Sequence, residues 1–172
     1  MIVVADTGPI NYLILSGHIR CVRELFGSLL IPPAVQRELL YPRAPVAVRT
    51  WAASLPDWAQ VRAPGEVARF RELGDGEREA IVLALEQKAD FVLMDETHGR
   101  QIAVQHGVAV KGTLGVLEDA AANRLIELGE AITKLKATNI FITEEILQAA
   151  LERNRSMQEQ PRQQPRNLDR ER

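Results

Sequence analysis

Short apolar runs alternate with segments of helical periodicity along most of the chain. Continuous apolar runs bounded by turn residues are typical of strands that are buried on both faces. They occur at residues 2–5, 29–31, 91–94 and 108–110, and residues 58–61 fit either a short strand or an extended linker. Strands that alternate with helices predict a parallel sheet covered by helices on both faces. The fold class that we expect is therefore α/β, a three-layer sandwich with a central parallel sheet.

Apolar residues spaced three and four apart predict the helices between these strands. Asp75-Gly76 precedes the strongest helical pattern and is expected to cap it, and Pro33 suits the first turn of another helix. The expected helical segments are 10–14, 19–26, 33–40, 45–54, 77–87, 102–105, 112–122, 127–136 and 143–152.

The chain has 172 residues, which suits one globular domain, and we place it at residues 1–152. Residues 153–172 carry a net charge of +3, are rich in Gln, Arg and Pro, and contain only two large apolar side chains. Such a composition buries too little to offset the entropy of ordering, so we expect a disordered tail. It is either a basic arm that contacts phosphates or an acidic partner, or a solvated terminus without a role.

Composition excludes several classes of protein. The single cysteine, Cys21, rules out a disulfide framework and a cysteine-cluster metal site. No apolar run is long enough to cross a bilayer, and the first residues lack the pattern of a secretory signal. The net charge of −2 argues against binding nucleic acid by bulk charge alone. We therefore expect a soluble, cytoplasmic protein with no membrane partner.

Acidic residues follow two of the predicted strands. Asp6 ends the first strand, and Asp95 with Glu96 ends the third. In parallel sheets these positions share one edge, where ligands bind. Carboxylates gathered there repel one another unless a cation neutralises them, and oxygen ligands without His or Cys suit Mg²⁺ or Mn²⁺. Such a site can hold a water that attacks a phosphodiester.

Each acid taken alone also has an ordinary structural explanation. Asp6 and Asp95 are placed to cap the helices that follow them. Glu77 and Glu79 lie in the first turn of a helix, where acids stabilise the helix dipole. An isolated Glu38 inside a helix is most often a solvated surface residue. Only their joint order along the chain favours a site.

That order resembles the PIN-domain ribonucleases, especially a prokaryotic branch that begins with an Asp-Thr/Ser-Gly/Ser-Pro run. The segments that carry the resemblance span nearly the whole globular part: VVADTGPINYL (3–13), IPPAVQREL (31–39), LGDGEREAIVLALEQKADFVLMDE (73–96) and VKGTLGVL (110–117). The family combines a central parallel sheet with acids that bind Mg²⁺ or Mn²⁺ and cleave single-stranded RNA. The resemblance implies the same fold and the same activity here.

Carried over by position, the resemblance implies metal-binding and catalytic roles for Asp6, Glu38, Glu77 and Asp95. It implies supporting roles for Thr7, Glu79, Glu96 and Thr113, with Glu79 an alternative to Glu77 as the third acid. Many family members have Asp at the third position, so Glu77 adds a methylene there. Toxin members often have a basic residue near the site, for which Arg78 and Arg100 are candidates. The toxin members of the family also imply a small antitoxin protein and a second copy of the chain, in a homodimer, as partners.

Two other interpretations compete with a metal-dependent ribonuclease. The tripeptide Asp6-Thr7-Gly8 also occurs in aspartic proteases, but those need two such carboxylates and an all-β fold. The second is a PIN-like module that binds nucleic acid or protein without turnover. Metal binding discriminates it from the enzyme, since a ligand of the folded state raises the melting temperature.

Overall fold

The computed structural model describes residues 1–66 and 68–159. Its strands form one sheet in the order β3-β2-β1-β4-β5, and every neighbouring pair is parallel. This arrangement confirms the α/β fold predicted from the alternation of apolar runs and helices. The strands are β1 (Val3–Ala5), β2 (Leu29–Ile31), β3 (Ala59–Val61), β4 (Phe91–Leu93) and β5 (Val110–Lys111).

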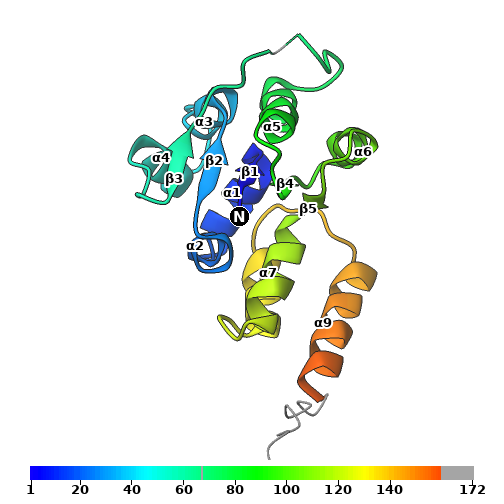
Figure 1. Ribbon diagram of the computed structural model, residues 1–172. Helices are drawn as coiled ribbons and strands as arrows, with labels where there is room; N and C mark the ends of the chain where they lie inside the picture. Colours follow the sequence, from blue (N-terminus) through cyan, green and yellow to red (C-terminus); the bar gives the residue numbers. More distant parts are fainter. Residues whose placement is uncertain (67, 160–172) are drawn as a thin grey trace, which may run out of the picture.

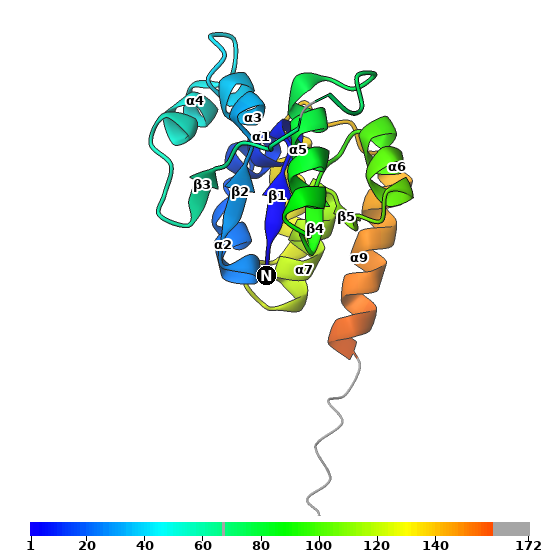
Figure 2. The same ribbon diagram turned by 45° about the horizontal axis from the view of Figure 1, so that its top comes forward.

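Helices cover both faces of the sheet, as Figures 1 and 2 show. Side chains alternate along β1, so Val3 and Ala5 join one buried cluster and Val4 joins the other. The larger cluster includes side chains of α1, α2, α7 and α8, and the smaller one those of α5 and α6. The helices are α1 (Thr7–Leu15), α2 (Arg20–Phe26), α3 (Pro33–Leu39), α4 (Val46–Ala53), α5 (Asp75–Glu86), α6 (Thr97–Gln105), α7 (Thr113–Ala122), α8 (Leu128–Lys136) and α9 (Glu144–Glu159).

The strand order places the ends of β1 and β4 side by side. Val4 pairs with Val92, and the backbone N–H of Asp6 donates to the carbonyl of Leu93 at 2.9 Å. Parallel strands end at the same edge of the sheet, so the residues after β1 and β4 lie at one edge. The next helices along the chain begin at this same edge. The sheet therefore positions Asp6 and Asp95 as neighbours.

Several predicted boundaries were wrong by a few residues. Helix α6 begins at Thr97, before the expected range of 102–105, and α1 begins at Thr7, before the expected range of 10–14. The last strand is Val110–Lys111, because the N–H of Val108 bonds the carbonyl of Ala103 and so closes α6, while Gly107 takes a φ of 82°. The N-cap of α5 is Gly74, and Asp75 is the first helical residue.

The C-terminal helix is longer than the sequence predicts. Helix α9 continues through Arg153 to Glu159, where we expected the disordered tail to have begun. Tertiary contacts account for the difference, because Asn154 is buried and Arg153 Nε donates to Glu118 Oε1 of α7 at 2.8 Å. The rest of the predicted tail, residues 160–172, lies outside the described residues.

None of the helices within residues 1–66 and 68–159 combines the length and the apolar character that a bilayer-spanning segment requires.

Candidate functional site

Asp6 is the most buried of the acids that the sequence analysis singled out, with 7% of its surface exposed. It occupies the N-cap position of α1, yet its side chain makes no capping hydrogen bond. Burial raises the pKa of Asp6 from 3.8 to about 7, and the charges of Glu38, Glu77 and Asp95 add to the rise, while the backbone N–H of Thr7 offsets part of it. The fold therefore gathers three carboxyl groups from separate elements around Asp6.

Glu38 reaches this cluster from α3 and is held by two donors. The hydroxyl of Thr7 donates to its Oε2, and the backbone N–H of Gly76 donates to its Oε1 at 3.0 Å. A Cβ atom at Gly76 would lie 2.6 Å from Oε2 and 2.8 Å from Oε1. A side chain at position 76 would therefore displace the carboxylate, which explains a glycine within the first turn of α5.

Glu77 keeps one oxygen without a partner. Its Oε2 accepts a hydrogen bond from the N–H of Gly74 at 3.3 Å, whereas its Oε1 is buried and has no hydrogen-bond partner in the described structure. Burial raises the pKa of Glu77, and the nearby carboxyl groups of Glu96 and Glu38 raise it further. The Glu77 carboxylate therefore lies within the cluster, with one oxygen free to bind a cation.

Asp95 is fixed by the start of α7. Thr113 donates to it twice, from the backbone N–H at 2.7 Å and from the hydroxyl at 2.6 Å. Asp95 thus stabilises the N-terminus of α7, and the idea that it caps the helix directly after it was wrong. Glu96 has that role, because its Oε2 accepts from the N–H groups of His98 and Gly99.

Glu79 is held outside the cluster. Its Oε2 accepts from the backbone N–H of Ala34 at 2.8 Å, and its Oε1 lies 3.8 Å from Arg37 Nη2. The carboxylate thereby satisfies a free N–H in the first turn of α3. Of the two candidates for the third acid, the structure places Glu77 among the other carboxylates and gives Glu79 a structural role.

Sequence reasoning did not single out Tyr12 of α1, whose side chain packs against the larger buried cluster. Burial raises the pKa of its hydroxyl, and the charge of Asp95 raises it further. Tyr12 lies inside the first segment that resembles the PIN domains, yet an aromatic residue at helical spacing looks like a core residue.

The two candidate basic residues differ in what they contact. Arg78 Nη2 pairs with the exposed Asp75 at 2.6 Å. Arg100 Nη1 donates to the carbonyl of Met94 at 2.8 Å. A Cβ atom at Gly112 would lie 2.9 Å from Arg100 Nη1 and 3.0 Å from Asp95 Oδ1, so these two charged groups flank the same glycine. Arg100 is the basic residue next to the acidic cluster.

A divalent cation suits the chemistry of this cluster. The unpartnered Oε1 of Glu77 and the buried carboxyl group of Asp6 are both costly in an apolar setting, and a hard cation would stabilise them. Among the described residues, no three His, Cys, Asp or Glu side chains are arranged as a metal shell. The carboxyl groups of Glu38, Glu77 and Asp95 nevertheless lie close enough to Asp6 for their charges to raise its pKa.

One comparison with known proteins identifies the family of the chain. The DUF3368 family model, described as a PIN domain, matches residues 2–156. The match covers every strand of the sheet and all four carboxylates. The comparison with curated proteins found no match, and the comparison with solved structures also found none.

Proposed function

Because the chain belongs to the PIN-domain family, a nuclease-type fold, we propose that it is a cytoplasmic, metal-dependent endoribonuclease that cleaves single-stranded RNA. The burial of Asp6 beside three further carboxyl groups supports this proposal most directly. Acids whose pKa is raised by burial and by neighbouring like charges are concentrated at functional sites.

Asp6, Glu38, Glu77 and Asp95 would hold one or two Mg²⁺ or Mn²⁺ ions. When bound, such an ion supplies positive charge against the phosphate and activates a water for attack. The remaining contribution comes from the chain, which keeps the carboxylates in place. Glu77 supplies one oxygen that lacks a hydrogen-bond donor, and Asp6 supplies a buried carboxyl group.

Three neighbouring groups position these acids. Thr7 and the N–H of Gly76 together hold both oxygens of Glu38, and Thr113 holds both oxygens of Asp95. Donors of this kind orient metal ligands before the ion arrives.

Cleavage of a labelled single-stranded RNA in millimolar Mn²⁺ tests the proposal. Activity should vanish on addition of EDTA and fall roughly 100-fold or more in Asp6→Asn, since a cation contributes several kcal/mol to the transition state. Asp57→Asn is the matched control, because Asp57 is exposed and lies just before β3, at the opposite edge of the sheet. Cleavage that persists in both EDTA and Asp6→Asn would contradict a metal mechanism.

A second candidate function is a module that binds nucleic acid without turnover. One observation favours it: within the described residues no carboxyl cluster has the arrangement of a metal shell. In that case RNA binds equally well with and without Mn²⁺, and Mn²⁺ leaves the melting temperature unchanged.

We also propose that a small antitoxin protein covers the acidic cluster and that the chain pairs as a homodimer, as the toxins of this family imply. Two exposed apolar side chains next to α3 and α4, Tyr41 at 58% and Val46 at 69%, offer surface for protein contacts. Sedimentation equilibrium tests the pairing, and a mass equal to one chain would contradict it.

A further inference from the structure

A cavity of about 690 Å³ opens beside Asp95, between the start of α7 and the start of α9. Asp95 and Arg100 form the wall that faces the acidic cluster, and Phe141 and Ile146 form the wall on the side of α9. The segment that joins α8 to α9 passes beside β5 before it enters α9 (Figure 1). The cavity therefore adjoins the proposed metal site but consists largely of residues outside it.

Phe141 is held in an outward position by its two neighbours. Ile140 and Ile142 pack against the hydrophobic core, whereas the side chain of Phe141 is 93% exposed. Alternation of this kind means that the backbone is fixed while the ring points into solvent. Ile146, also exposed at 51%, extends the apolar surface. A fixed, exposed aromatic ring loses little conformational freedom when it stacks on a planar partner.

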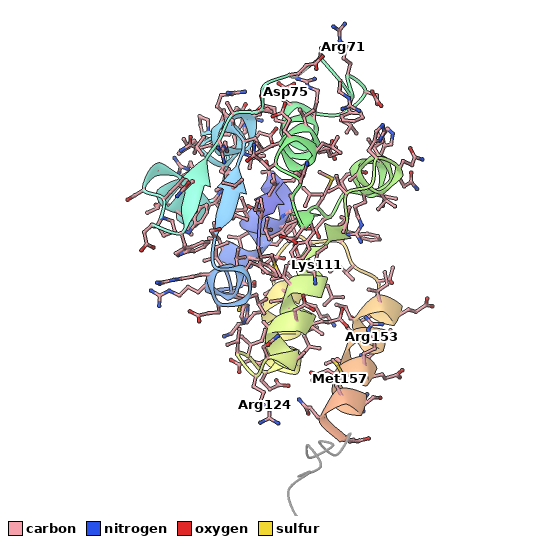
Figure 3. All side chains as sticks on the ribbon, viewed as in Figure 1. Arg71, Asp75, Lys111, Arg124, Arg153 and Met157 are labelled. Atoms are coloured by element: carbon pink, nitrogen blue, oxygen red, sulfur yellow. The ribbon has the colours of Figure 1, made fainter. Side chains whose placement is uncertain are left out.

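The charges in this cavity favour a phosphate. Arg100 lies beside Asp95 and forms no ion pair within the described residues, so most of its guanidinium is available. Lys111 and Arg153 also line the cavity, and they pair with Asp119 and Glu118. Figure 3 shows both basic residues at the junction of β5, α7 and α9.

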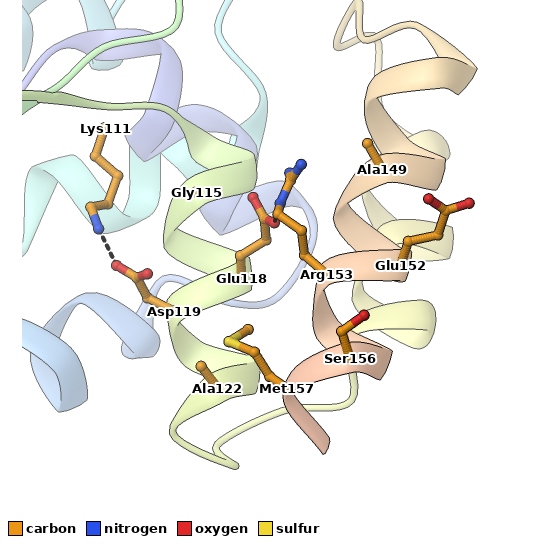
Figure 4. A pocket seen from close by; sticks show the side chains of 10 residues that line it. All are labelled: Lys111, Gly115, Glu118, Asp119, Ala122, Ala149, Glu152, Arg153, Ser156 and Met157. Atoms are coloured by element: carbon orange, nitrogen blue, oxygen red, sulfur yellow. Dashed lines mark hydrogen bonds and ion pairs between the residues drawn. The ribbon is translucent and has the colours of Figure 1, made fainter. Parts of the chain in front are cut away.

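The adjoining cavity between α7 and α9, drawn in Figure 4, has the opposite character. Its volume is about 720 Å³, and it shares Lys111, Glu118 and Arg153 with the first cavity. Asp119 and Glu152 add two further carboxylates, and no aromatic side chain lines it. A nucleic-acid strand would be repelled there, so of these two adjoining cavities the one at Phe141 suits a nucleotide.

We propose that this cavity binds the nucleotide next to the scissile phosphate of single-stranded RNA, with Phe141 stacking on its base and Arg100 binding its phosphate. The proposal rests on the ribonuclease function proposed above and adds the residues that hold the substrate. Stacking on one aromatic ring is tolerant of sequence, because every base has a π face. The cavity therefore contributes affinity and position but little sequence preference.

Binding of a labelled single-stranded RNA, measured by fluorescence anisotropy, tests this role. All proteins carry Asp6→Asn, so that the proposed cleavage does not consume the probe. Phe141→Ala should weaken binding about 5- to 100-fold, and Phe141→Trp should restore it. The ring is almost fully solvent-exposed, so its removal leaves the fold intact. Leu125→Ala is the matched control, since Leu125 is an exposed apolar residue beyond the far end of α7.

A set of RNAs with one abasic position identifies the stacked base. With Phe141 present, one abasic position should weaken binding more than the others. In Phe141→Ala that position should make no further difference. Arg100→Gln should reduce the slope of log affinity against log salt by about 0.7, the value for one phosphate of a single strand. Arg124→Gln, at the far end of α7 (Figure 3), should leave the slope unchanged.

Two results separate this inference from the proposed function. If Phe141→Ala binds RNA as tightly as its parent, or loses affinity equally for every abasic RNA, the cavity does not bind a base, and the exposed ring is left for contact with a protein partner. If the chain without any substitution fails to cleave RNA in Mn²⁺, the proposed ribonuclease function is contradicted instead. The result of the binding experiment is unaffected.

Discussion

Asp95 accepts two hydrogen bonds from Thr113, one at each carboxylate oxygen, at 2.7 and 2.6 Å. The acid that follows β4 is thus oriented by the first residue of α7, 18 positions further along the chain. Thr113 has no exposed surface, so water cannot replace its hydroxyl. This contact joins the N-terminus of a helix to a proposed metal ligand.

Replacing Thr113 with Val should leave the shape of the side chain but free one oxygen of Asp95. We expect kcat/KM for RNA cleavage to fall about 10- to 100-fold, the usual effect of losing a group that orients a metal ligand. The unpaired, partly buried oxygen should also lower the free energy of unfolding, by about 1 kcal/mol. Thr113→Ser, which keeps the hydroxyl, should retain most of the activity. Equal activity of Thr113→Val and the parent would show that this bond has no role in catalysis.

A methyl group at Gly76 should inactivate the site without unfolding the protein. In Gly76→Ala the new Cβ would lie 2.6 Å from Glu38 Oε2, and the carboxylate would move because it is the end of a flexible side chain. Alanine in place of glycine within a helix otherwise stabilises by up to about 1 kcal/mol. We expect at least about 10-fold slower cleavage with little change in melting temperature. Gly129→Ala in α8 is the control, and it should remain active.

The stability of the metal-free protein should depend on pH through Asp6. Its pKa is about 7 in the folded state and near 3.8 in the unfolded chain, so the folded state binds an extra proton between these values. The contribution of this proton to the free energy of unfolding is fully present below about pH 4, and it is lost as the pH rises through 7. In EDTA, Asp6→Asn should therefore raise the free energy of unfolding at pH 8, by up to about 4 kcal/mol.

Chemical denaturation at pH 8 and at pH 4 measures this difference. The gain from Asp6→Asn should be large at pH 8 and small at pH 4, where the folded state is protonated and the unfolded chain is close to its pKa of 3.8. A gain of the same size at both values would mean that the charge of Asp6 is not the source of the strain.

Mn²⁺ should stabilise the protein by binding the same carboxyl groups. At a concentration 100 times the Kd, a ligand of the folded state adds about 2.7 kcal/mol to the free energy of unfolding. The rise in melting temperature should be reversed by EDTA and absent in Asp6→Asn. Unchanged melting in millimolar Mn²⁺ would favour the module without turnover.

Glu77 and Glu79 should differ in what their loss affects. Glu77→Gln removes a charge from the cluster and should abolish cleavage while leaving the fold stable. Glu79→Gln weakens the contact to the N–H of Ala34 and should cost about 0.5–2 kcal/mol of stability, the range for loss of a helix cap. Its cleavage rate per folded molecule should be unchanged. The opposite pattern of activities would make Glu79 the third acid.

Much of the fold could be predicted because it depends on local patterns. The runs at Val3–Ala5, Leu29–Ile31 and Phe91–Leu93 are apolar throughout, as strands buried on both faces must be. Glycine and proline mark the ends of several helices for steric reasons that hold in any protein. The extension of α9 could not be predicted, because Arg153 and Asn154 are ordered by contacts with residues far away in the chain.

The candidate site divides in the same way. The acids and their order along the chain were evident from the sequence, and so was the edge of the sheet at which two of them lie, because parallel strands share one direction. The choice between Glu77 and Glu79 depended on which donor each carboxylate meets. Glu79 meets the N–H of Ala34 only after α3 and α5 have packed together. The environment of Phe141 was equally invisible, since burial of Ile140 and Ile142 is a property of the assembled core. Local periodicity therefore predicts the helices, the strands and the candidate residues. The partners of each charged group depend on how distant segments pack together, and the order of residues along the chain does not give that.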